Sequence, residues 1–214
     1  GISGGIDSSG SSTLSAMTGL KTIVLSMPIK QKENQHDLSL KHQHWLVKKF
    51  ENVEAHTVSL DNLFTAFSST LNKFDNEHGF ANSRARLRMT TLYQVAAANK
   101  GIVVGTGNKV EDFGVGFYTK YGDGGVDISP IADCNKTEIW ELGKELDILK
   151  EIIDAPPTDG LWDDGRTDEG QLGFKYEDLE DAMINPKSPH KEEYEKIRKQ
   201  NLHKMEPIPV CKIP

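Results

Sequence analysis

Residues 1–8 read Gly1-Ile2-Ser3-Gly4-Gly5-Ile6-Asp7-Ser8, a pattern that indicates a phosphate-binding loop. Its adjacent glycines let the backbone approach an anion closely and adopt positive φ where a turn requires it. Hydroxyl groups of Ser3, Ser8 and Ser9 add donors, and a following helix would direct its N-terminal amides at the same anion. Ordinary turns use the same residue types, so a plain surface loop is the alternative interpretation.

Asp7 is the member of this loop that a simple anion site does not need. A carboxylate beside phosphate groups is repelled unless a cation lies between them, and Mg²⁺ is commonly held by carboxylates and phosphate oxygens together. The stretch does not match the Walker pattern, because no lysine follows the glycines. The loop therefore predicts a site for the pyrophosphate part of a nucleotide with a magnesium ion attached.

Strand-like apolar runs alternate with helical stretches along the rest of the chain. The strand-like runs cover 21–27, 53–60 and 101–105, and the helical stretches cover 35–50, 61–74, 82–98, 135–149, 176–184 and 190–201. Such alternation is typical of βαβ units, so we predict an α/β fold: a Rossmann-like, doubly wound, mainly parallel sheet flanked by helices. Ligands bind at the carboxyl ends of the strands in these sheets, where the opening loop, the Pro28 region and 105–108 all lie.

Length and charge limit the remaining possibilities. We interpret the 214 residues as a single domain over 1–214, and as N-terminally incomplete because a phosphate loop of this kind follows a strand. A net charge of −7 without a long basic run argues against a nucleic-acid partner. No apolar run approaches the roughly 20 residues that a membrane span needs, so no membrane partner is expected. Cys134 and Cys211 match no zinc spacing and fit the reduced thiols of a cytoplasmic protein.

A glycine-rich segment over 105–136 carries a second group of charged residues. Its carboxylates are Glu111, Asp112, Asp123 and Asp127, and its cations are Lys109, Lys120 and Lys136. A solvated glycine loop would use the same residues. However, a loop of this length in a compact domain usually has a function, so we interpret it as part of the site that the opening loop begins.

Several motifs, taken in order, resemble those of the NAD synthetases, which are N-type ATP pyrophosphatases. They are the opening Ser-Gly-Gly-x-Asp-Ser loop, Thr119-Lys-Tyr-Gly-Asp-Gly-Gly-x-Asp127, Pro157-Thr-Asp-Gly-Leu-Trp162, Thr167-Asp-Glu with Leu172-Gly-Phe-Lys-Tyr176, and His203-Lys204 with Pro207. The similarity covers essentially the whole chain. It implies ATP-dependent amidation of deamido-NAD (nicotinic acid adenine dinucleotide) to NAD with ammonia, through an adenylated intermediate and with release of AMP and pyrophosphate.

The resemblance also implies roles for individual residues. Those matching ATP contacts are Gly1, Ile2, Ser3, Gly4, Gly5, Ile6, Asp7, Ser8, Met27, Thr106, Lys136 and Thr158. Those matching deamido-NAD contacts are Arg86, Lys120, Asp127, His203 and Lys204. The implied catalytic residues are Lys136, which would neutralise charge at the reacting phosphates, and Asp123, which would take a proton from the incoming ammonium.

Asp7 and Glu111 are the implied ligands of Mg²⁺. Asp112 competes with Glu111 for this role, and we choose Glu111 because it keeps the Gly-Thr-Gly-Asn-Lys-x-Glu spacing. One departure from the family concerns the first helix, where Gly10 and Ser11 replace an apolar pair. Glycine is a poor helix former, so this departure should weaken the helix.

Two other functions compete with this interpretation. A different ATP pyrophosphatase, such as a tRNA-modifying or GMP-forming synthetase, would want a basic surface, extra cysteines or a different substrate segment. A non-catalytic nucleotide-binding module is the other, and retention of Asp7, Glu111, Asp123 and Lys136 together argues against it. The chain contains no nitrilase-type glutaminase, so we expect free ammonia as donor, with a glutaminase domain ahead of Gly1 as the alternative. The resemblance further implies a homodimer.

Overall fold

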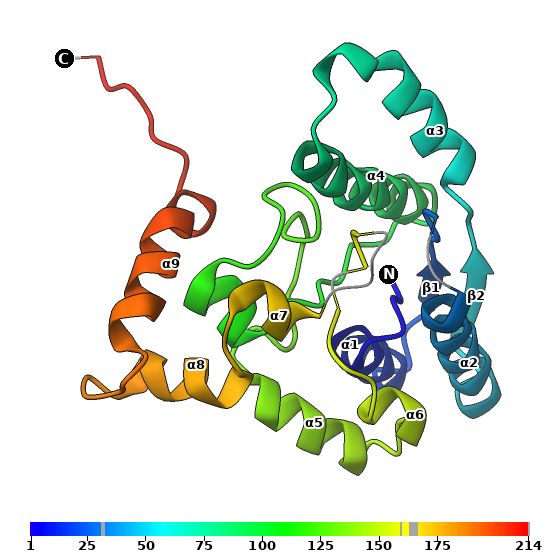
Figure 1. Ribbon diagram of the computed structural model, residues 1–214. Helices are drawn as coiled ribbons and strands as arrows, with labels where there is room; N and C mark the ends of the chain where they lie inside the picture. Colours follow the sequence, from blue (N-terminus) through cyan, green and yellow to red (C-terminus); the bar gives the residue numbers. More distant parts are fainter. Residues whose placement is uncertain (31–32, 159, 163–166, 214) are drawn as a thin grey trace.

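The computed structural model describes residues 1–30, 33–158, 160–162 and 167–213. Figure 1 shows the course of the chain through its elements. The strands are β1 (Thr22–Ser26) and β2 (Val53–Thr57). The helices are α1 (Ile6–Met17), α2 (Glu33–Lys49), α3 (Asp61–Thr70), α4 (Glu77–Ala98), α5 (Lys136–Glu145), α6 (Lys150–Ile153), α7 (Asp168–Leu172), α8 (Tyr176–Ile184) and α9 (Lys191–Met205), with a 3-10 turn η1 (Asn72–Phe74) and a π-helix η2 (Lys109–Val115).

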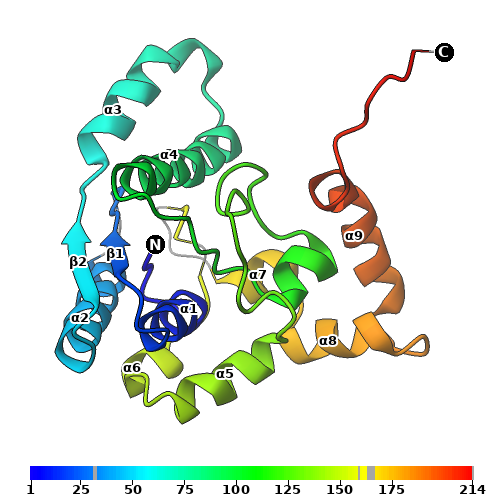
Figure 2. The same cartoon turned by 180° about the vertical axis from the view of Figure 1, so that it is seen from behind.

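Strands β1 and β2 form a parallel pair connected by α2, with Thr22 opposite Val53. Successive side chains of β1 point to opposite faces of the sheet. Val24 packs in a cluster with residues of α1 and α2, whereas Leu25 packs in a cluster with residues of α3 and α4. Figures 1 and 2 show the same arrangement from both sides, with α4 lying apart from α1 and α2. Helices on both faces of a parallel sheet confirm the predicted α/β class.

The strand expected over 101–105 is wrong as a strand of its own. This segment makes one parallel bridge, between Val104 and Ile128, supported by the Asp127 amide donating to the Val103 carbonyl over 2.9 Å. Its other side faces a cavity of about 430 Å³ that β1 also lines. One bridge is too few for a hydrogen-bonded ladder, so this segment is not a regular strand.

The strand expected ahead of Gly1 stays a prediction. The Ile2 amide donates to the Leu25 carbonyl over 2.8 Å, and both β1 and Val104 line the cavity described above. The opening loop therefore begins beside β1, on the side of that strand that faces the cavity.

Three differences between the predicted and the observed helices have a common physical cause. Helix α4 begins at Glu77 rather than at residue 82, because the Asn76 side chain accepts a hydrogen bond from the Gly79 amide over 2.7 Å and caps the helix. Part of the expected glycine-rich loop is the π-helix η2, capped where Asn108 accepts from the Glu111 amide over 2.9 Å. Helix α7 forms where no helix was predicted, and the Thr167 side chain caps it by accepting from the Gly170 amide. Polar caps and not apolar periodicity set all three starts.

The elements η2, α8 and α9 pack as a separate layer beside the sheet. A buried cluster joins η2, α8 and α9 through Val110, Val115, Leu179 and Tyr194. In Figures 1 and 2 these elements lie on the opposite side of α1 from β2. None of the described helices combines the length and the apolar character that a membrane span requires.

Candidate active site

The opening loop closes on itself and passes directly into α1. The Ser3 hydroxyl accepts from the Gly5 amide over 3.2 Å, and the Ser8 hydroxyl donates to the Gly5 carbonyl over 3.0 Å. Gly4 has φ of 94°, in the region that favours glycine. Because Gly5 is the N-cap of α1, the free amides of the first helical turn face the same side as the loop. This geometry is suited to an anion.

A cavity of about 230 Å³ lies above this loop and collects residues from distant parts of the chain. The residues expected to contact ATP that line it are Gly1, Ile2, Ser3, Gly5, Ile6, Asp7, Ser8, Met27, Thr106, Lys136 and Thr158. Glu111 and Asp123 line it as well, whereas Gly4 does not. The structure therefore brings the expected ATP, metal and catalytic positions together around one space.

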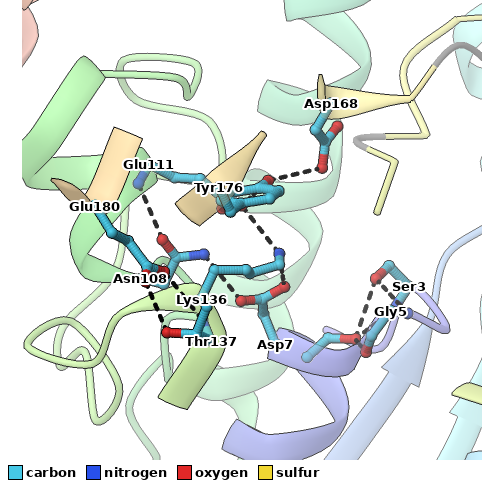
Figure 3. Close-up of polar contacts among 11 residues, drawn as sticks. Ser3, Gly5, Asp7, Asn108, Glu111, Lys136, Thr137, Asp168, Tyr176 and Glu180 are labelled. Atoms are coloured by element: carbon cyan, nitrogen blue, oxygen red, sulfur yellow. Dashed lines mark hydrogen bonds and ion pairs between the residues drawn. The ribbon is translucent and has the colours of Figure 1, made fainter. Parts of the chain in front are cut away.

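Lys136 is the centre of the charged cluster at the floor of the cavity. Its side chain is 2% exposed, and its ammonium donates to Asp7 Oδ2 over 2.5 Å and to Glu111 Oε1 over 3.0 Å, as Figure 3 shows. Burial alone would lower the pKa of Lys136, but the carboxylates of Asp7 and Glu111 outweigh it and raise that pKa. The lysine stays charged throughout the physiological range.

Two further contacts hold this cluster in place. Asn108 donates from its side-chain amide to Asp7 Oδ1 over 3.0 Å. Next to Lys136, the Thr137 hydroxyl donates to Glu180 Oε2 over 2.7 Å, and the Thr137 amide donates to Oε1 over 3.0 Å (Figure 3). These two hydrogen bonds tie the start of α5 to α8 and so fix the position of the Lys136 backbone next to Thr137.

Tyr176 and Asp168 belong to the same cluster, although sequence reasoning assigned no role to them. The Tyr176 hydroxyl donates to Glu111 Oε1 over 2.6 Å and lies 3.4 Å from Asp168 Oδ2. Burial, together with the negative charges of Glu111 and Asp168, raises the pKa of Tyr176, so its hydroxyl keeps its proton. Tyr176 stands in a motif that carries the family resemblance, which was the available signal.

The structure separates Glu111 from its neighbour Asp112. Glu111 contacts Lys136 and lines the cavity, whereas the Asp112 side chain packs over Gly107 and does not line it. Burial, reinforced by the charges of Glu111 and Asp123, raises the pKa of Asp112 to about 7. Because Glu111 lines the cavity and contacts Lys136 whereas Asp112 does neither, the geometry favours Glu111 as the metal ligand.

Asp123 lines the cavity from a tight turn. Its Oδ1 accepts from the Thr119 amide over 2.9 Å, and the Gly122 amide donates to the Thr119 carbonyl over 2.9 Å. Asp123 is exposed, unlike Lys136. Asp123 and Lys136, the two proposed catalytic residues, therefore line the cavity from different segments, one exposed and the other buried.

The residues expected to bind deamido-NAD do not line this cavity. Four of them gather beside it: Arg86 donates to the Lys120 carbonyl over 3.3 Å, Lys120 donates to the His203 carbonyl, and Lys204 donates to the Gly116 carbonyl over 2.7 Å. Burial lowers the pKa of Lys204. Asp127 lies apart and supports the backbone, since its Oδ2 accepts from the Val103 amide over 2.7 Å.

Comparison with known proteins accounts for this combination of features. Residues 1–212 match the family model of NAD synthase. The chain belongs to the NAD synthase family. It is 38% identical over 190 residues to the NH(3)-dependent NAD(+) synthetase of Carboxydothermus hydrogenoformans, covering 86% of this chain and 75% of that protein. It is 36% identical over 206 residues to the corresponding protein of Finegoldia magna, covering 95% of this chain and 83% of that protein.

Solved structures agree with the membership of this chain in the NAD synthase family. An NMN synthetase from Francisella tularensis superposes with a TM-score of 0.89 at 33% identity, covering 99% of this chain and 87% of that one. An NH3-dependent NAD synthetase from Campylobacter jejuni superposes with a TM-score of 0.78 at 24% identity, again covering 99% and 87%, and shows the shared fold. Family membership confirms the predicted resemblance, the fold class and the prediction of an ATP-using ligase. It does not favour an RNA-modifying enzyme, a GMP-forming enzyme or a binding module.

The carboxylates of Asp7 and Glu111 form a donor set that fits a divalent cation. Asp7 and Glu111 both contact the Lys136 ammonium, so their carboxylates are close enough for one cation to touch both. Each carboxylate offers the hard oxygen ligands that Mg²⁺ prefers, and their two negative charges exceed the single positive charge of Lys136. Among the described residues, no group of three or more histidine, cysteine, aspartate or glutamate side chains surrounds a single metal position. Two carboxylates supplemented by phosphate oxygens is the arrangement that the residues allow.

Proposed function

We propose that this chain converts deamido-NAD to NAD by ATP-dependent amidation with ammonia, releasing AMP and pyrophosphate. The observation that carries the proposal is the placement of Asp7, Glu111 and Lys136 around one cavity above a phosphate-binding loop. A curated relative 38% identical to this chain is an NH3-dependent NAD+ synthetase. Fold alone would not identify the reaction, but this arrangement of residues supports it.

The first step transfers the adenylyl group. A carboxylate oxygen of the nicotinate ring attacks the α-phosphorus of ATP, and the bond from that phosphorus to the bridging oxygen breaks, so pyrophosphate leaves. The opening loop binds the phosphates through its amides and the hydroxyls of Ser3 and Ser8. Lys136 stabilises the negative charge that builds on the phosphate oxygens, because a buried cation acts strongly at short range.

The second step forms the amide bond. The nitrogen of ammonia attacks the activated carboxyl carbon, the carbon–oxygen bond to AMP breaks, and Asp123 takes a proton from the nitrogen. An adenylate hydrolyses readily, so water must be kept from it. The segments 105–106, 122–126 and 155–158 line the cavity around the reacting groups and are suited to this exclusion.

Mg²⁺ is the proposed metal, held by Asp7 and Glu111. When bound, it supplies positive charge that stabilises the leaving pyrophosphate. Asn108 donates to Asp7 Oδ1 and so helps to orient the Asp7 carboxylate. The choice of Glu111 over Asp112 rests on cavity lining and on the contact with Lys136.

The acceptor half of the site is assigned to Arg86, Lys120, Asp127, His203 and Lys204. Arg86, Lys120 and Lys204 gather positive charge beside the cavity, which suits the phosphates of a dinucleotide. A homodimer over a single 1–214 domain and a cytoplasmic location are part of this proposal, in keeping with the family resemblance and with an enzyme that consumes ATP.

A second candidate is amidation of nicotinic acid mononucleotide by the same chemistry. It is favoured by the likeness to the NMN synthetase of Francisella tularensis, which is 33% identical and covers 99% of this chain. Both reactions use the same ATP half of the site. They differ only in whether the acceptor carries an adenylate group, so the region around Arg86 and Lys204 would decide between them.

The test is a comparison of acceptors and nitrogen donors with the purified protein. Deamido-NAD and nicotinic acid mononucleotide are each supplied with ATP, Mg²⁺ and either ammonium or glutamine, and amide product and AMP are quantified. We expect deamido-NAD to give a kcat/KM at least tenfold higher than the mononucleotide, with ammonium as the effective donor. A reversed acceptor preference would support the second candidate. AMP release that depends on neither acceptor would contradict both.

A further inference from the structure

Tyr176 carries a polar group into the middle of an apolar cluster. Its side chain is 0% exposed, and its ring packs edge-on against Trp140 with the ring centroids 6.0 Å apart. Val110 and Leu179 belong to the same cluster. Burying a hydroxyl among such neighbours is unfavourable unless it is hydrogen-bonded. The fold supplies that partner in Glu111.

The Tyr176 hydroxyl and the Lys136 ammonium bind the same oxygen of Glu111. The distances to Oε1 are 2.6 Å from the hydroxyl and 3.0 Å from the ammonium. The ammonium also lies 4.8 Å from the centroid of the Tyr176 ring. Two donors on one oxygen restrict rotation of the carboxylate, and both leave Oε2 for other ligands.

The same hydroxyl also lies near a second segment that lines the cavity. Asp168 Oδ2 lies 3.4 Å from it, and the Asp168 amide donates to the Pro157 carbonyl over 3.0 Å. Pro157, Thr158 and Asp168 all line the cavity. A hydroxyl has a single hydrogen to donate, and the shorter distance assigns that hydrogen to Glu111. Tyr176 therefore donates to Glu111, while Asp168 lies beside the same hydroxyl.

We propose that Tyr176 is a positioning residue that orients the Glu111 carboxylate for the metal ion of the bound nucleotide, an inference that rests on the proposed function. Tyr176 does not itself line the cavity, so it acts through Glu111. Its hydroxyl should matter for the binding of the magnesium complex of ATP and not for the binding of ATP without metal. A role in packing alone would affect both equally.

The test uses the Tyr176→Phe variant, which removes the hydroxyl and keeps the ring. Titration calorimetry measures binding of ATP with Mg²⁺ and of ATP with a chelator. We expect Tyr176→Phe to weaken binding of the magnesium complex about tenfold, the scale of a hydrogen bond to a charged group. Binding of metal-free ATP should stay within twofold of the wild type. The control is Tyr194→Phe, since Tyr194 is buried in the same cluster, and it should leave both affinities unchanged.

A double-mutant cycle with Glu111→Gln tests whether the hydroxyl acts through Glu111. If it does, Tyr176→Phe should have less than a twofold effect when glutamine occupies position 111. Equal losses with and without Mg²⁺, or an undiminished effect in the Gln variant, would overturn the proposal. So would failure of Tyr176→Phe to fold while Tyr194→Phe folds, because the hydroxyl would then serve folding. Amidation of deamido-NAD by the unaltered protein tests the proposed function separately, and it can succeed while this inference fails.

Discussion

The Lys136 ammonium lies 2.5 Å from the Asp7 carboxylate, although 129 positions separate the two residues in the chain. Asp7 is in the first turn of α1, and Lys136 is the first residue of α5. These helices pack against each other through Ile6 and Ile139, which share one buried cluster. The contact therefore depends on apolar packing, and it places a cation where the N-terminal dipoles of two helices would otherwise disfavour one.

Substitution of Lys136 should lower the rate of adenylation strongly while the protein still folds. We expect Lys136→Met to reduce AMP formation by about 10²–10³, the range for loss of one preorganised electrostatic group. The check is a rate of pyrophosphate release with saturating ATP and acceptor. Lys109→Met is the matched control, because Lys109 pairs with the exposed Asp133 at the surface. A comparable loss in both variants would contradict the role of Lys136.

The neighbours Glu111 and Asp112 offer a direct test of the metal assignment. Glu111→Gln should raise the Mg²⁺ concentration for half-maximal activity at least tenfold, because it removes one of two carboxylate ligands. Asp112→Asn should change that concentration less than twofold, since Asp112 does not line the cavity. The measurement is a Mg²⁺ titration of AMP formation. The opposite ranking of the two variants would transfer the ligand role to Asp112.

Stability should fall in mild acid because of His42. This residue is 0% exposed, and burial lowers its pKa from 6.5 to about 4, although the Ser9 backbone partly offsets the effect. Between these values the unfolded chain binds a proton that the folded protein does not, so the free energy of unfolding falls as pH drops from 6.5 to 4. The expected loss is about 3 kcal/mol.

Urea denaturation at pH 7 and pH 4 checks this prediction. The His42→Gln variant cannot titrate, so it should lose less stability over this interval than the wild type does. His44→Gln provides the control, because His44 lies in the same helix and is exposed. Identical pH dependence in the wild type and His42→Gln would show that another group causes the loss.

Gly10→Ala should stabilise the protein. Gly10 lies within α1, and a Cβ atom added there would meet nothing within 4 Å. Alanine forms helix better than glycine, so we expect a gain of about 1 kcal/mol in the free energy of unfolding. Gly143→Ala in α5 is the matched comparison, since its Cβ would lie 2.5 Å from Ile6 Cδ1 and should destabilise the fold. Thermal unfolding of both variants checks this prediction: the unfolding temperature should rise for Gly10→Ala and fall for Gly143→Ala.

Local signals in the sequence predicted several elements well. The acidic helix over 176–184 matches α8, and the helix expected from about 135 begins at Lys136, where the Asn135 amide donates to Glu138. Both elements carry their own apolar faces, and α5 also carries its own capping box, so neighbouring residues suffice to define them. The start of α4 was misplaced because two possible Asn caps occur, at 76 and 82, and the Asn82 side chain instead donates to the His78 carbonyl within the helix.

What the sequence by itself determined is the set of residues that we propose as the ATP half of the site. The glycines, hydroxyls and carboxylate of residues 1–8 are contiguous, so their chemistry can be inferred without knowing the fold. The family motifs added Glu111 and Lys136 to this set. Only the tertiary structure decided that Tyr176 supports Glu111, that Asp112 turns away, and that the Arg86 and Lys204 group lies beside the cavity. These relationships join residues far apart in the chain, and the packing of helices against the sheet brings them together.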